Sequence, residues 1–156
     1  MTLEQAAVIE PLSIGLYAVK MSVALHEAAI GVLGCGPIGM SVILPALAHG
    51  AGSVYVTDKI EERLELARLS GAAWTGNPDN TDVVADIVER EPLLLDAVFE
   101  CCGQQDALDQ AVELLKPGGK LMLIGIPLVD RVSFNVDKLR RKEICVQNVR
   151  RQNECM

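Results

Sequence analysis

The chain contains 156 residues, and its 14 lysines and arginines against 21 aspartates and glutamates give a formal net charge of −7. Hydrophobic residues make up 50% of the chain, which excludes an intrinsically disordered protein at this modest charge. The length predicts a single domain, 1–156, and the acidic balance argues against binding to nucleic acids, whose phosphates require a basic surface.

The cysteines show the pattern of neither a metal site nor a disulfide framework. Their number is odd and no two of them form a C-x-x-C pair, so their spacing excludes a zinc knuckle. We therefore expect reduced, mostly buried thiols. The chain start carries no basic segment of a signal peptide, and together these features predict a cytoplasmic protein. The five cysteines are Cys35, Cys101, Cys102, Cys145 and Cys155.

The first predicted elements are helical. Residues 2–22 predict two short helical pieces that break at Glu10-Pro11, because proline removes a helix hydrogen bond. Residues 28–57 carry no charge and exceed the ~20 residues that span a bilayer, but glycines and prolines divide this run. Parallel strands covered on both faces have the same hydropathy, so the run predicts a strand, a helix and a second strand rather than a membrane span.

Short apolar runs alternate with amphipathic stretches along the rest of the chain. Strands are predicted at 29–33, 53–57, 94–100, 120–126 and 143–148, with a weak strand near 73–75. Helices are predicted at 38–49, 60–69, 81–89, 105–115 and 136–141. This alternation indicates an α/β fold, an open, doubly wound parallel sheet of the Rossmann type with about six strands and helices on both faces. Such sheets bind ligands at the carboxyl ends of the strands, where the strand order reverses.

The sharpest motif is the G-x-G-x-x-G segment Gly34-Cys35-Gly36-Pro37-Ile38-Gly39. It follows a predicted strand and opens a predicted helix, with Pro37 in the first turn, where its missing N–H costs nothing. Gly34 permits the tight turn, Gly36 lets the backbone approach a pyrophosphate, and the last glycine allows close helix packing. The free N–H groups and the helix dipole would then stabilise the phosphate charge. The motif predicts a dinucleotide site.

An acidic residue, Asp58, closes the next predicted strand 19 residues after Gly39. Its carboxylate would accept hydrogen bonds from the ribose hydroxyls of the adenosine and would repel a 2′-phosphate, which favours NAD over NADP. Lys59 and Arg63 are cations near the ribose, so they leave room for NADP. Residues 58–61 also read as a capping box for the following helix, and the two roles of Asp58 can coexist.

Several further segments carry a resemblance to a known family. From residue 4 to residue 153 the chain resembles the coenzyme domain of zinc-containing medium-chain alcohol dehydrogenases, in particular the sorbitol (polyol) and threonine dehydrogenase branch. The segments that carry it are the glycine motif, Glu10-Pro11-Leu12-Ser13-Ile14-Gly15, Val56-Thr57-Asp58, Glu100-Cys101-Cys102-Gly103, Leu115-Lys116-Pro117-Gly118-Gly119 and Leu123-Ile124-Gly125-Ile126-Pro127.

The resemblance implies roles for individual residues. The glycine motif would hold the pyrophosphate, Asp58 the ribose, and Arg63 would lie near the adenosine. Glu10 would lie close to the catalytic zinc. Cys101 and Cys102 would line the coenzyme cleft. The nicotinamide carboxamide would contact Ile124, Gly125 and Ile126. The nicotinamide and substrate side would include Asn148, Val149 and Arg151.

The resemblance also implies what this chain lacks. Relatives carry the main ligands of the catalytic zinc, the Lewis acid that polarises the alcohol, in an N-terminal domain that this sequence does not include. We therefore expect the chain to bind coenzyme without turning over substrate, and we assign it no catalytic residue. In the parent enzyme a hydride would pass between a small secondary alcohol or polyol and the nicotinamide.

The resemblance also implies how the chain assembles. In this family an edge strand pairs across a two-fold axis, which implies a homodimer or homotetramer with residues 131–135 and 143–148 near the interface.

Two other functions are compatible with the motifs. One alternative to a dehydrogenase domain is a non-catalytic, NAD-sensing regulatory module. Another is an S-adenosylmethionine-dependent methyltransferase, because such enzymes have a similar glycine-rich loop and acidic strand end.

Overall fold

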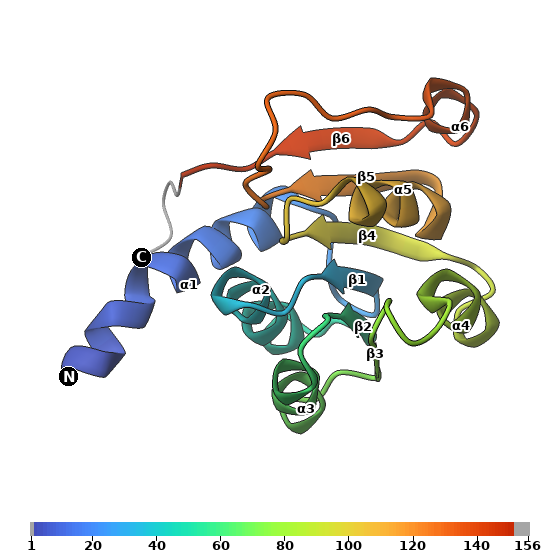
Figure 1. Cartoon of the computed structure of the whole chain (residues 1–156). Coiled ribbons are helices and arrows are strands. Elements are labelled where there is room, and N and C mark those ends of the chain that lie inside the picture. The colour runs from blue at the N-terminus through green and yellow to red at the C-terminus, as the bar shows by residue number, and fades with distance from the viewer. Residues whose placement is uncertain (1, 152–156) are drawn as a thin grey trace.

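The computed structural model describes residues 2–151 and consists of one sheet flanked by helices (Figure 1). The helices are α1 Leu3–Met21, α2 Pro37–Ala48, α3 Glu61–Leu69, α4 Val83–Arg90, α5 Gln105–Leu114 and α6 Val136–Arg141. The strands are β1 Ala29–Leu33, β2 Ser53–Thr57, β3 Trp74–Gly76, β4 Leu95–Glu100, β5 Leu115–Leu123 and β6 Cys145–Asn148. All strands are parallel, in the order β3-β2-β1-β4-β5-β6, which confirms the predicted doubly wound fold.

The strand order reverses at β1. Ile30 in β1 pairs with Val54 in β2 on one side and with Ala97 in β4 on the other. The loops that leave β1 and β4 therefore diverge to opposite sides of the sheet and open a crevice at its carboxyl edge. Backbone hydrogen bonds fix both loops at this edge. The Gly34 N–H donates to the Thr57 carbonyl at the end of β2, and the Cys101 N–H donates to the Leu33 carbonyl at the end of β1.

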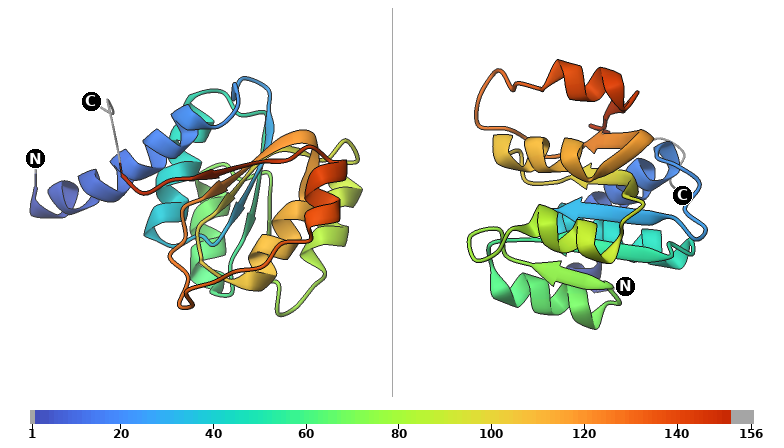
Figure 2. Two further views of the ribbon diagram at one scale, coloured as in Figure 1. Left: turned by 90° about the horizontal axis from the view of Figure 1, so that it is seen from above. Right: turned by 90° about the vertical axis from the view of Figure 1, so that its right-hand side faces the viewer.

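The helices form one layer on each face of the sheet (Figure 2). Side chains alternate along β1, so Ile30 and Val32 pack against the layer of α1, α2 and α3, whereas Leu33 packs against that of α4, α5 and α6. Phe99 and Met122 on neighbouring strands are fully buried on the α1–α3 side. Burying each such side chain stabilises the fold by roughly 1.5–3 kcal/mol.

The N-terminal segment is one continuous helix, so the predicted break at Glu10-Pro11 is wrong. Thr2 and Gln5 form a capping box, with Gln5 N–H donating to the Thr2 hydroxyl at 3.2 Å. Pro11 lies inside the helix and removes one hydrogen bond, at a cost of about 3 kcal/mol. The capping box stabilises the N-terminal end of α1, and packing of the second half against α2 stabilises the C-terminal end. Together these interactions outweigh the cost of the lost hydrogen bond. The first half projects from the body of the molecule (Figures 1 and 2).

Strand β5 differs most from its predicted bounds of 120–126. It begins earlier because its first residue already pairs with β4 across an irregular register. It ends at Leu123 because the N–H groups of Ile124 and Gly125 both turn to the carbonyl of Glu100, at 3.0 and 2.9 Å. Residues 124–126 therefore lie in a loop at the carboxyl edge. The other predicted strands and helices agree with the structure within two residues at each end.

The uncharged run 28–57 forms β1, α2 and β2, as its glycines and prolines predict. None of the helices in the described part of the chain is both long and apolar enough to cross a membrane.

Substituting Gly15 tests the close contact between α1 and α2. A Cβ atom at Gly15 would lie 2.0 Å from the Ser41 carbonyl oxygen, so the two helices must separate to accept it. We expect Gly15→Ala to lower the free energy of unfolding by about 1–3 kcal/mol in urea denaturation. Ser13→Ala on the same helix removes only a bond to a carbonyl of that helix and serves as control. Equal stability of the two variants would contradict the contact.

Candidate functional site

The glycine motif forms the loop between β1 and α2. Gly34 has φ +93°, which L side chains rarely adopt, and a Cβ there would lie 2.9 Å from the Cys102 Cβ. A Cβ on Gly39 would lie 2.0 Å from the Gly34 carbonyl oxygen. Gly36 is different, because the atoms within 4 Å of its Cβ position belong to Arg63 alone. Two of the glycines therefore permit the tight loop, whereas Gly36 leaves open space above it.

Helix α2 begins at this loop and presents its N-terminus to the open space. Gly36 is the N-cap, Pro37 is the first helical residue, and Ile38 anchors the turn against the core. Within the described chain, the first turn has no acidic residue and no side-chain cap. The first N–H groups of a helix have no partner within the helix, and the dipole favours an anion beside them. The arrangement can hold a phosphate.

Asp58 follows β2 and turns its carboxylate toward the same loop. Its Oδ2 accepts a hydrogen bond from the Cys35 N–H at 2.6 Å, and its Oδ1 accepts one from the Ile60 N–H at 2.9 Å. Arg63 Nη1 lies 3.6 Å from Oδ2, and Asp58 is only 8% exposed. A carboxylate offers about four lone-pair sites, so two remain for a ligand's hydroxyl groups.

The predicted capping box at residues 58–61 is wrong. Helix α3 begins at Glu61 with Ile60 as its N-cap and without a side-chain cap. Asp58 lies two residues too early to cap the helix, and its second oxygen is engaged by the glycine loop instead. The long-range contact therefore decides the role of this carboxylate.

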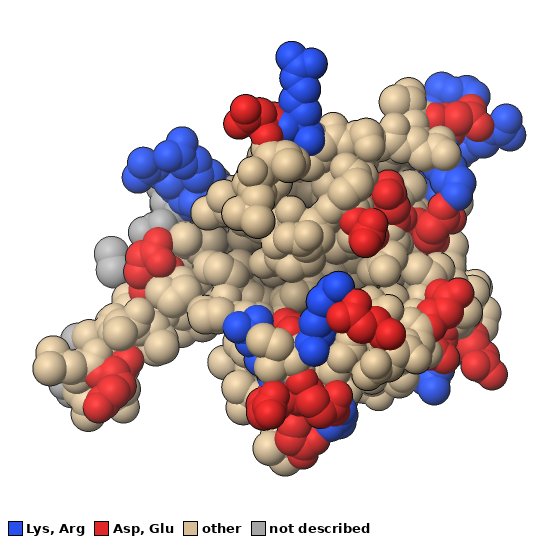
Figure 3. Space-filling view, viewed as in Figure 1, with Lys and Arg blue, Asp and Glu red and all other residues tan. Residues whose placement is uncertain are grey.

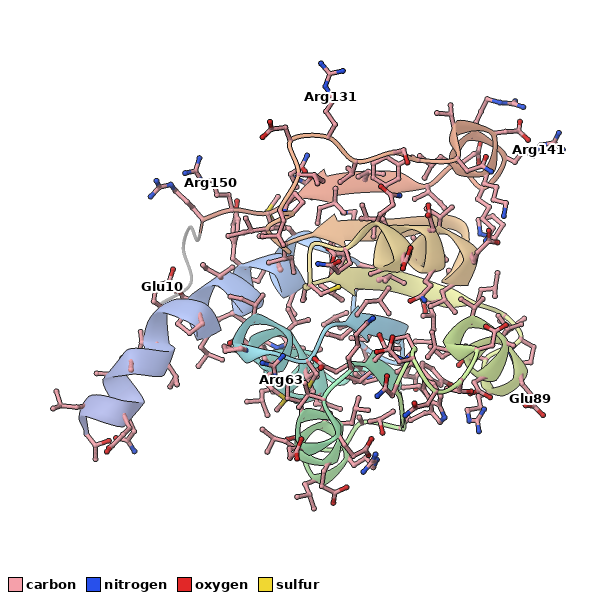
Figure 4. The ribbon with its side chains drawn as sticks, in the orientation of Figure 1. Glu10, Arg63, Glu89, Arg131, Arg141 and Arg150 are labelled. Carbon is pink, nitrogen blue, oxygen red and sulfur yellow. The ribbon has the colours of Figure 1, made fainter. Side chains whose placement is uncertain are left out.

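A cavity of about 420 Å³ opens beside Asp58. It contains two cations, and each has a carboxylate partner, because Lys59 pairs with Asp79 at 2.7 Å and Arg63 faces Asp58. Figure 3 shows acidic and basic side chains lying beside one another over α3, and Figure 4 shows Arg63 between α2 and α3. The cavity is lined by Gly34, Thr57, Asp58, Lys59, Ile60, Arg63, Pro78, Asp79, Cys102, Gln104, Asp106, Ala107 and Gln110.

Glu100, which the sequence analysis did not assign to the site, organises the next loop. It ends β4, is 2% exposed, and accepts hydrogen bonds on Oε1 from the N–H groups of Cys102 and Gly103, at 2.8 and 2.6 Å. Its main-chain carbonyl accepts those of Ile124 and Gly125. One residue thus fixes the loops after β4 and β5. An acidic residue that directly follows the apolar run Ala97-Val98-Phe99 was the signal that could have identified it.

A second cavity, of about 540 Å³, lies on the other side of this loop and is mostly apolar. It brings together five residues that the resemblance implied: Ile124, Gly125, Ile126, Asn148 and Val149. Arg151 is exposed and lies outside the lining, whereas Arg150, which the sequence analysis did not name, belongs to it (Figure 4). Glu100 and Gly103 also line this second cavity.

The cysteines are more exposed than predicted. Cys35 is buried and Cys101 is half-buried, but Cys102 and Cys145 are exposed, and Cys155 lies outside the described residues. Burial and the Asp58 carboxylate raise the pKa of Cys35 to about 11, and partial burial with the Glu100 carboxylate raises the pKa of Cys102 to about 12. Burial also raises the pKa of Cys101 well above its usual value. These three thiols are protonated at neutral pH and are poor nucleophiles.

Glu10, the residue implied to lie near a zinc ion, is exposed on the projecting half of α1 (Figure 4). Among residues 2–151, His, Cys, Asp and Glu side chains form no group of three or more that could hold a metal ion. The described side chains therefore do not provide the ligand set of a zinc site.

Comparison with known proteins identifies related sequences. The profile of a family described as zinc-binding dehydrogenase matches residues 37–156. The chain is 32% identical over 147 residues to the sorbitol dehydrogenase of Bacillus subtilis, covering 94% of this chain and 42% of that protein. It is 32% identical over 149 residues to the D-xylulose reductase of Saccharomyces cerevisiae, covering 92% and 42%. The chain spans less than half the length of these curated relatives.

Solved structures show the same fold. The 2R,3R-butanediol dehydrogenase of Bacillus subtilis superimposes with a TM-score of 0.90 at 32% identity, over 99% of this chain and 44% of that one. A zinc-binding dehydrogenase from Sinorhizobium meliloti 1021, bound to NADP, gives a TM-score of 0.84 at 29% identity, over 90% and 42%. The match extends over the whole sheet and its helices.

The pKa values of the thiols predict their labelling. At pH 8 we expect iodoacetamide to alkylate the exposed Cys102 more slowly than free glutathione, because the neutral thiol of Cys102 is stabilised beside Glu100. Labelling of Cys35 should be slower still, because its thiol is buried as well as protonated. Mass spectrometry of peptides measures each rate. Alkylation of Cys102 as fast as that of glutathione at pH 8 would contradict the assignment.

Proposed function

Because the chain belongs to the zinc-binding dehydrogenase family, we propose that it binds NAD at the carboxyl edge of its sheet. The observation that carries this proposal is the buried Asp58 carboxylate, which lies against the glycine loop with two lone-pair sites free for hydroxyl groups. The parent activity would be hydride transfer between a secondary alcohol or polyol and the nicotinamide, as the names of the relatives suggest.

The pyrophosphate of NAD would lie on the N-terminus of α2. The absent side chain at Gly36 leaves space for it, and the first N–H groups of a helix have no partner within the helix and can donate to a phosphate. Arg63 lies beside Gly36 and adds a positive charge at the same place. The electrostatics favour an anion over the loop even though the chain as a whole is acidic.

The adenosine would occupy the cavity beside Asp58, with its ribose hydroxyls donating to the carboxylate. A 2′-phosphate would bring a negative charge against this buried carboxylate, so the proposed coenzyme is NAD rather than NADP. Lys59 and Arg63, the two cations of the cavity, are already paired with carboxylates. The structure of the Sinorhizobium relative holds NADP, so this fold accepts that coenzyme, and we propose that local charges in this chain disfavour it.

The nicotinamide would extend into the second cavity. Ile126 is 87% exposed at its rim, so a nicotinamide ring stacked there would remove apolar surface from water. Bound NAD supplies the hydride acceptor, and the residues of this chain bind and orient it. We propose that groups outside the described residues polarise the alcohol, as the family resemblance implies.

Titration calorimetry tests this function. We expect the chain to bind NAD, to bind NADP more weakly, and to show no binding of S-adenosylmethionine, the ligand of the methyltransferase alternative. Binding of S-adenosylmethionine without NAD would refute the proposal.

Replacement of Asp58 tests the proposed ribose contact. Asp58→Ser should weaken NAD binding about a hundredfold, since two hydrogen bonds to a charged group are lost, and should narrow the difference in affinity between NAD and NADP. Glu89→Gln removes the same charge on the outer end of α4, away from Arg63 (Figure 4), and should leave both affinities unchanged. Circular dichroism verifies that both variants fold. An unchanged preference in Asp58→Ser would exclude the ribose role.

The edge strand β6 is the proposed site of assembly into a homodimer or homotetramer. It pairs with β5 on one side, and its other side has no partner strand among the described residues. An open edge offers backbone groups to another strand, and a two-fold axis brings two copies of β6 together with residues 131–135 nearby.

Sedimentation velocity over a concentration series measures this association. We expect Cys145→Lys, which places like charges across the axis, to shift the chain toward monomer. Leu69→Lys on α3, an exposed position far from β6, adds the same charge as a control. A clean monomer at high concentration before any substitution would refute the interface.

A further inference from the structure

Each cation of the Asp58 cavity is held by a carboxylate. Arg63 lies beside Gly36 and faces Asp58, so its positive charge is next to the glycine loop and pairs with the buried carboxylate. Lys59 extends to Asp79, and the two ends lie 2.7 Å apart. Asp106 lines the same cavity and adds a further negative charge. The lining therefore contains more acids than bases, and neither base is free to meet an additional anion.

The loop after β3 positions Asp79 opposite Lys59. The side-chain amide of Asn77 donates to the Lys59 carbonyl at 3.1 Å, which ties this loop to the segment after β2. The carbonyl oxygen of the same amide accepts from the Asp79 N–H at 2.9 Å. Two hydrogen bonds from one asparagine thus fix both partners of the ion pair. The exposed Lys59–Asp79 ion pair therefore forms between two segments whose main chains are already joined through Asn77.

Recognition of a 2′-phosphate requires an available cation. Phosphate oxygens are bound by arginine or lysine side chains through charge-assisted hydrogen bonds. Lys59 directly follows the ribose acid Asp58, and its side chain is 64% exposed on a flexible stem. Without Asp79 its ammonium group would be the available cation of the cavity. The hydrogen bond to Asp79 also raises the pKa of Lys59.

We propose that Asp79 is a second determinant of coenzyme selectivity, which holds the Lys59 ammonium group and thereby denies it to the 2′-phosphate of NADP. The proposal rests on the proposed binding of a nicotinamide dinucleotide in this cavity. It adds a distinct physical effect to that of Asp58. Asp58 disfavours the phosphate by direct repulsion, whereas Asp79 removes the cation that could compensate for that repulsion.

The test is titration calorimetry of the whole chain with NADP and NAD at low ionic strength. The measured quantity is the ratio of the two dissociation constants. We expect Asp79→Asn to lower the ratio for NADP over NAD by about fivefold, the upper range for one exposed charge pair. In the Lys59→Ala background the same substitution should produce no such gain. Asp79 is itself largely exposed, so its replacement by asparagine is compatible with folding.

Glu89→Gln is the matched control, because it changes the net charge equally at a position away from Arg63 (Figure 4). A lower ratio in Asp79→Asn that vanishes in the Lys59→Ala background supports the proposal. An unchanged ratio with intact NAD binding overturns it, and so does a gain that persists without Lys59. Absence of binding for both coenzymes overturns the proposed function and this inference with it, so the two failures are distinguishable.

Discussion

The hydrogen bond from the Cys35 N–H to the Asp58 carboxylate is the contact on which the candidate site depends. It joins the loop after β1 to the end of β2 and holds a charged group that is almost entirely buried. A buried carboxylate is costly unless donors surround it, and here the donors are backbone N–H groups of the site itself. The glycine loop and its acidic partner are therefore pre-organised by one interaction.

The same device recurs at the end of β4. Glu100 is buried like Asp58 and accepts N–H groups from the loop that follows its own strand. The two carboxylates lie on opposite sides of β1, at the carboxyl edge where the strand order reverses. Each fixes a loop that lines one of the two cavities. The acidic composition of the chain thus includes carboxylates that shape the site as well as those that keep the surface charged.

Much of this could be predicted from the sequence, because the relevant signals are local. The apolar runs and their spacing indicate the parallel sheet, and the predicted bounds of β1, β2 and α6 agree with the structure at both ends. The six residues of the glycine motif include a tight turn, a position without a side chain and the start of a helix. Its local geometry can therefore be predicted without knowing any contact to a distant segment. The acid at the end of β2 follows from the βαβ spacing.

Tertiary structure decided the features that depend on contacts between distant segments. Packing of α1 against α2 keeps α1 continuous across Pro11, although a proline by itself favours a break in the helix. The Glu100 carbonyl ends β5 early and turns residues 124–126 into a loop. Lys59 meets Asp79 because the loop after β3 is tied to the end of β2. The sequence by itself determined the fold class and the dinucleotide motif through local periodicity, whereas the charge balance of the cavity depended on which loops the sheet brings together.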